Sequence, residues 1–232
     1  MKVFRNYIII IWGLLVAVAC SYEFPEIDSL GQQNLGEIDN SKVVVIGDGY
    51  MAGVMDGALY NKGQQNSLGS IIYSHLNLSD SATYNQPAIN SENGYNLFIQ
   101  NQNNIHGRWV NNFEGLYDEN PELVLTAGNE ITSFNGDLTN VDDLSVPLLK
   151  INDLQGDKLN QNPFFNRISG NPSENYISLI NKKDPSFIIC WIGMGDFLDF
   201  AVGGAEVEDL LTPENEFYTR FEHLISGLLE GS

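Results

Sequence analysis

The 232-residue sequence has few basic residues: 11 lysines and arginines stand against 30 aspartates and glutamates, which gives a formal net charge of −19. Nucleic acids and anionic membrane surfaces repel such a chain, so the composition argues against both as partners. Charged residues make up only 18% of the sequence and hydrophobic ones 43%, which excludes a disordered polyelectrolyte. The chain is long enough for one sizeable core and short for two.

The first nineteen residues have the pattern of an export signal. Lys2 and Arg5 precede an apolar run over residues 8–18 that is too short to span a bilayer comfortably. The following Ala17-Val18-Ala19-Cys20 resembles the lipobox of bacterial lipoproteins. This resemblance implies cleavage before Cys20 and acylation of both its thiol and its amine, an anchor that does not readily dissociate.

Residues 1–19 are therefore expected to be a lipoprotein signal peptide, and residues 20–41, rich in small polar and acidic residues, a tether. A plain secretory peptide stays open as an alternative, and a transmembrane anchor has less support. Because lipidation uses Cys20, the second cysteine, Cys190, is left alone and no disulfide is expected. Cys190 lies in an apolar run and is predicted to be an inert core residue.

The residues after Cys20 also bear on where the protein is sorted. Ser21 resembles outer-membrane sorting in Gram-negative bacteria, and the acids Glu23, Glu26 and Asp28 resemble the surface-export signal of Bacteroidetes lipoproteins. We therefore expect an exported protein, held at the outer membrane of a Gram-negative bacterium by its lipid anchor. Whether it faces the periplasm or the cell surface stays open.

Two short apolar runs, Val43–Ile46 and Phe187–Ile192, predict strands buried on both faces of a parallel sheet. Each run is followed by a turn rich in Gly and Asp. Helices are predicted at four places by caps and periodic apolar residues: Ser67–Leu76, a short helix opened by Asn162, Ser173–Lys182, and a long one begun by Thr212-Pro213-Glu214. Strands alternating with helices predict an α/β layered domain over residues 42–232.

The segment over about residues 77–141 is rich in Asn, Ser and Gly and has no sustained period. We expect an irregular insertion there, with short hairpins near residues 96–99 and 123–125.

Several blocks of this domain, in consistent order from about residue 42 to 231, resemble the SGNH (GDSL) hydrolases, in particular a branch of Bacteroidetes lipoproteins. The matching residues are Val45-Ile46-Gly47-Asp48-Gly49-Tyr50-Met51-Ala52-Gly53 for the first block, Asp56-Gly57-Ala58-Leu59-Tyr60 after it, Leu144-Ser145-Val146-Pro147 for the second block, and Asn162-Pro163-Phe164-Phe165 and Trp191-Ile192-Gly193-Met194-Gly195-Asp196-Phe197-Leu198 for the third. The resemblance implies a three-layer α/β/α fold with a parallel, flavodoxin-like sheet. It also implies a sheet that is incomplete at the C-terminus, because relatives continue there with more sheet and an Asp-x-x-His.

The family's chemistry would need a serine nucleophile on the first block, two further oxyanion donors and an Asp-x-x-His. At the nucleophile position this sequence has Gly49, at the second-block glycine Leu148, and at the third-block asparagine Gly195. Loss of one oxyanion donor typically lowers the rate by roughly 10² to 10³. Replacing Gly195 by Asn is expected to rebuild one such donor. We expect Gly49 and Gly195 to lie close together at the carboxyl edge of the sheet.

The remaining polar candidates have structural explanations. Asp48 and Asp196 are expected to cap or brace their turns, and a metal site that joins them to Asp199 is the weaker alternative. The three histidines, none of which follows an aspartate at the spacing of the dyad, are expected at a helix end (His75), in a loop (His106) and facing solvent (His223). No metal and no cofactor are expected.

Three accounts of function remain open. The first is a catalytically silent, SGNH-like lipoprotein that has a binding or structural role, with the membrane as partner through its anchor and a small acyl or carbohydrate molecule as ligand. The second is an active ester hydrolase on lipid, acyl or acetyl-carbohydrate substrates, for which Ser67, Ser145 or Ser173 would have to act. The third is a truncated remnant of a longer enzyme.

Overall fold

The computed structural model describes residues 39–76, 83–99, 104–113, 120–154, 158–171, 173–207 and 211–230. All of them belong to one compact unit that spans Asp39–Ser232. The expected signal peptide, Cys20 and the tether up to residue 38 lie outside the described residues. Within the described ranges, no helix combines the length and the apolar character that crossing a bilayer requires.

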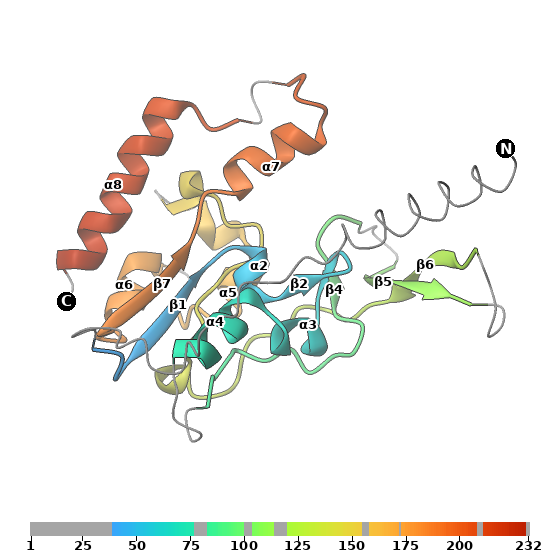
Figure 1. The fold of residues 1–232 in the computed structure, drawn as a ribbon, viewed down its shortest axis with the longest axis horizontal. Helices are drawn as coiled ribbons and strands as arrows, with labels where there is room; N and C mark the ends of the chain where they lie inside the picture. Colours follow the sequence, from blue (N-terminus) through green and yellow to red (C-terminus); the bar gives the residue numbers. More distant parts are fainter. Residues whose placement is uncertain are drawn as a thin grey trace, which may run out of the picture. The chain divides into compact units, whose positions relative to one another are not determined.

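The fold is mixed α/β, and its centre is a parallel pair of strands, β1 (Val43–Gly47) and β7 (Phe187–Trp191). The two run side by side in Figure 1, with Val43 opposite Phe187 and Gly47 opposite Trp191. Both predicted strands and their parallel pairing are confirmed.

The other edge of β1 is also occupied. Residues 142–146 run alongside it, joined by a parallel bridge between Val45 and Asp143. The backbone N–H of Val45 donates to Asp142, and those of Leu144 and Val146 donate to Val45 and Gly47. β1 is therefore bonded along both edges, which explains why a run of four β-branched residues without any polar alternation is stable there.

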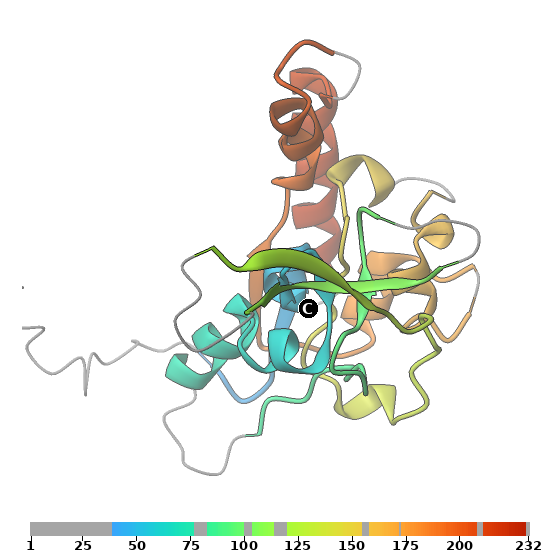
Figure 2. The same ribbon diagram turned by 90° about the vertical axis from the view of Figure 1, so that its right-hand side faces the viewer.

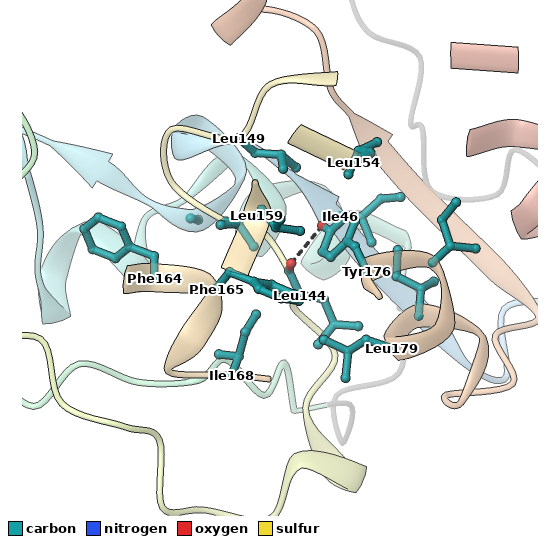
Figure 3. Packing of buried hydrophobic residues seen from close by; sticks show 14 of the residues in the cluster. Ile46, Leu144, Leu149, Leu154, Leu159, Phe164, Phe165, Ile168, Tyr176 and Leu179 are labelled. Carbon is teal, nitrogen blue, oxygen red and sulfur yellow. Dashed lines mark hydrogen bonds between the residues drawn. The ribbon is translucent and has the colours of Figure 1, made fainter. Parts of the chain in front are cut away.

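The two faces of β1 are buried in different clusters. Val43 and Val45 pack with residues of α2 (Gly49–Ala52) and α4 (Leu68–Leu76). Val44 and Ile46 face the larger core, to which α5 (Pro163–Asn166), α6 (Tyr176–Asn181) and α8 (Glu214–Glu230) contribute. Figure 3 shows this core, in which the Tyr176 hydroxyl donates to the carbonyl oxygen of Leu144 at 2.8 Å.

Strand β7 is far less covered than the sequence predicts. Its first three residues are half-buried and its last two exposed, with Trp191 at 48% exposure. The prediction of a strand buried on both faces is wrong here, and so is that of Cys190 as a core residue, because its side chain is exposed. The reason is topological: among the described residues β7 has only β1 as a strand partner, so its outer edge lacks cover.

The helix starts mostly follow the predicted caps. The Ser67 hydroxyl accepts from the backbone of Ser70 at the start of α4, and the Asn162 side chain caps α5. The predicted cap Ser173 is wrong, since Asn175 accepts from the backbone of Ile177 and α6 begins after it. Asn is as good an N-cap as Ser, and the apolar face of α6 does not begin until Tyr176.

The segment expected to be an irregular insertion is more regular than its sequence suggests. Its strand β4 (Tyr95–Asn96) joins β2 (Val54–Met55) and β3 (Ala58–Leu59), which both precede α4, in one small antiparallel sheet. Strands β5 (His106–Asn112) and β6 (Glu122–Ala127), in green in Figure 2, form a hairpin. This confirms the hairpin predicted near residues 123–125, whereas residues 96–99 contribute only the end of β4.

The remaining elements are short. They are α3 (Asn61–Gln65), α7 (Gly195–Val202), and the 3₁₀ turns η1 (Leu138–Asn140), η2 (Ile151–Leu154) and η3 (Leu159–Gln161).

The unequal burial of the two strands gives a stability prediction. Ile46 in β1 is fully buried and Ile189 in β7 only partly. We expect Ile46→Ala to lower the free energy of unfolding by about 3–4 kcal/mol and Ile189→Ala by about 1–2 kcal/mol, because the first leaves a closed cavity and the second does not. Urea unfolding followed by circular dichroism measures both, and equal losses would show that β7 is as enclosed as β1.

Candidate ligand-binding site

A pocket of about 740 Å³ lies at the carboxyl ends of β1 and β7. Gly49, which follows β1, and Gly195, which follows β7, both line it. Leu148 follows residues 142–146, the stretch that runs alongside β1, and it lines the pocket as well. Gly49 and Gly195 thus lie at the same edge of the sheet, as expected, and the three positions from the sequence blocks line a single pocket.

The wall of the pocket is mainly apolar. Its apolar side chains come from β2, from the segment after β4, from the stretch before η2, and from α7 and the turn before it: Val54, Met55, Leu97, Phe98, Leu148, Leu149, Met194 and Leu198. The sequence did not identify Leu97 and Phe98 as pocket residues, because they lie in the expected insertion. The aromatic residues of that Asn-rich segment were the one available signal that it packs on the domain.

Four charged residues line the pocket, and three of them have charged or hydroxyl partners. Lys150 forms an ion pair with Asp199. The Asp56 carboxylate accepts a hydrogen bond from the Tyr60 hydroxyl at 2.8 Å, and it lies 3.9 Å from the guanidinium of Arg108.

The fourth charged residue, Asp48, is only 3% exposed. Its Oδ1 accepts from the backbone N–H of Tyr50 at 3.1 Å and thereby caps α2, as predicted. Its Oδ2 is buried and has no hydrogen-bond partner among the described residues. Burial raises the pKa of this carboxyl, and an unsatisfied buried acceptor of this kind costs about 1–3 kcal/mol.

Asp196 also has the predicted bracing role. It is fully buried; its Oδ2 accepts from the backbone of Ile151 at 2.8 Å and its Oδ1 from the Thr212 hydroxyl at 2.6 Å. Asp196 thus holds the start of α7 against η2 and against the residues that lead into α8. The Thr212 hydroxyl was expected to cap α8, but it donates to Asp196 instead. The described part of the chain contains no group of three His, Cys, Asp or Glu placed to hold a metal ion.

The space around the two glycines limits what could replace them. A Cβ on Gly195 would lie 2.6 Å from the carbonyl oxygen of Leu149, a contact that only a backbone shift can relieve. The donor predicted from Asn at this position would therefore require such a shift. A Cβ on Gly49 would lie 3.1 Å from a Val54 methyl, which is tight but movable.

Leu148 holds an unusual backbone conformation. Its φ is +63°, in the left-handed region that glycine adopts freely and other residues adopt at a cost of roughly 1–2 kcal/mol. Its side chain is 43% exposed along the pocket. A leucine therefore occupies a backbone position suited to glycine, the residue that the family pattern has there.

None of the candidate nucleophiles or bases lies in the pocket wall. Ser67 is the cap of α4, Ser145 is buried beside Asp143, and Ser173 lies in the turn before α6. None of the three is among the residues that line the pocket.

The histidines are equally remote. His75 ends α4 and donates from Nδ1 to the carbonyl of Ile71 at 2.7 Å, and His223 is exposed, both as predicted. His106 was expected in a loop but is the first residue of β5, paired with Ala127. No serine or histidine is therefore placed in this pocket by the described residues.

Comparison of this chain with protein-family models, with curated proteins and with solved structures found no match.

The backbone of Leu148 gives a prediction for the site. Leu148→Gly and Leu148→Ala both remove the side chain, but only glycine relieves the left-handed conformation. We expect the glycine variant to be more stable than the alanine variant by about 1 kcal/mol in urea unfolding. At Ile225, inside α8, the order should be reversed, with glycine about 1 kcal/mol less stable than alanine; the same order at both sites would contradict the assigned strain.

Proposed function

We propose that the chain is a catalytically silent, SGNH-like lipoprotein whose pocket binds an apolar, chain-like ligand. The observation that carries the proposal is that Gly49, Leu148 and Gly195, the positions of three oxyanion or nucleophile groups in the family pattern, meet in one apolar pocket. The three-layer α/β/α arrangement is part of the proposal, supported by the helices that cover both faces of β1. The acyl anchor at Cys20 and the outer-membrane location belong to it as well.

The dimensions and chemistry of the pocket favour ligand binding. A volume of about 740 Å³ falls within the roughly 300–1,000 Å³ of typical small-molecule sites, which are likewise apolar with a few polar groups. An alkyl chain that enters this wall leaves water, and each methylene contributes about 0.8 kcal/mol. The site is thus suited to the acyl part of a ligand.

The same geometry disfavours ester hydrolysis. The nucleophile position has no hydroxyl, and the wall offers no imidazole to activate one. An active enzyme would have to use Ser67, Ser145 or Ser173, and these lie outside the pocket lining. A retained binding pocket with lost chemistry is therefore the better account of the site.

Titration with a series of straight-chain alcohols tests the binding function. From hexanol to decanol, the affinity measured by calorimetry should rise about fourfold per methylene until the chain fills the pocket.

A matched pair of variants localises the effect. Leu198 in the pocket wall and Ile225 on α8 are equally exposed, at 37%. Leu198→Gln should weaken decanol binding at least tenfold and Ile225→Gln should leave it unchanged. Binding that does not depend on chain length, or that both variants weaken alike, would reject the pocket as the site.

A further inference from the structure

We infer that the pocket selects chains whose polar end is cationic, with an alkylammonium preferred over an alcohol and a carboxylate excluded. This inference rests on the proposed function and names the ligand class of that same pocket.

Only one oxygen of the Asp48 carboxylate accepts a hydrogen bond from the described residues. One oxygen is used by the backbone N–H of Tyr50, which fixes the side chain at the start of α2. The other oxygen, Oδ2, is buried and receives no hydrogen bond from any described residue. Asp48 is among the residues that line the pocket, so its carboxylate charge lies beside a bound ligand, and no hydrogen bond from a described residue offsets the charge at Oδ2.

The other charged side chains of the pocket wall have partners of their own. Among the described residues that line the pocket, Lys150 is the only cation, and its ammonium is already paired with Asp199. Asp56 is engaged by the Tyr60 hydroxyl and lies close to Arg108. An entering carboxylate is therefore repelled by three acids and meets no cation that is without a partner, whereas an ammonium is attracted by the Asp48 carboxylate.

The electrostatic field of the whole chain acts in the same direction as the charges of the pocket wall. A net charge of −19 attracts cations and repels anions at long range, so it favours the same ligands as the local contacts. A long-range preference of this kind does not depend on any one carboxylate, whereas local attraction by the Asp48 charge does. The two contributions can therefore be separated by substitution.

The experiment compares three ligands of one chain length, octylamine, octanol and octanoate, by calorimetry with the full chain at about pH 8, where carboxylates ionise and alkylamines stay protonated. Octylamine should bind most tightly, at least tenfold more tightly than octanoate. Octanoate that binds as tightly as octylamine overturns the inference and leaves the binding function standing. Binding of none of the three rejects the proposed function itself, and with it the inference.

Two charge-removing variants then assign the selectivity. Asp48→Asn keeps a side-chain oxygen for the α2 cap, and Asn caps helices as well as Asp. It should lower the preference for octylamine over octanol at least tenfold. Asp56→Asn removes the same charge from the same wall, at a φ of +51° that Asn tolerates, and should change the preference less than about threefold.

Equal effects of the two variants would assign the selectivity to the general negative field and overturn the role of Asp48. If Asp48→Asn does not fold, as judged by its urea transition, the ranking of the three ligands on the unmodified protein still decides between a pocket that prefers cations and one that does not.

Discussion

The packing of β1 decides where the pocket lies. Four consecutive β-branched residues are buried on both faces, and hydrogen bonds run along both edges of the strand, to β7 and to residues 142–146. All three of these segments run in the same direction, so their carboxyl ends come together and the turns that follow them share one edge. Gly49, Leu148 and Gly195 meet for this reason and need no direct contact with each other to do so.

Around that edge, the buried carboxylates hold the backbone rather than perform chemistry. Asp196 joins α7 to η2 and to Thr212, and Asp48 caps α2 with one oxygen. Each fixes a turn at the end of a strand and so helps to shape the pocket. Gly195 approaches Leu149 so closely that the pocket leaves little room for a side chain at Gly195. Leu148 does carry a side chain, at the cost of a left-handed backbone.

The sequence was sufficient for those features that depend on local patterns. Unbroken apolar runs located β1 and β7, and cap residues such as Ser67 and Asn162 located helix starts, because these signals act within a few residues. It was insufficient where partners are distant in the chain. The exposure of β7 depends on what lies along its outer edge, and the place of Leu97 and Phe98 in the pocket depends on how an aperiodic segment folds back. Asn175 replaced Ser173 as a cap because two good capping residues lay close together and the apolar face of α6 decided between them.

The central claim is that the pocket has lost catalysis, and hydrolysis of p-nitrophenyl octanoate by the purified protein tests it most directly. The account predicts release of nitrophenol at the rate of the buffer control, for the unmodified protein and for Gly49→Ser alike, since a serine there would have no base to take its proton. An enzyme-like rate that survives repurification and disappears on substitution of Ser67, Ser145 or Ser173 by alanine would contradict it.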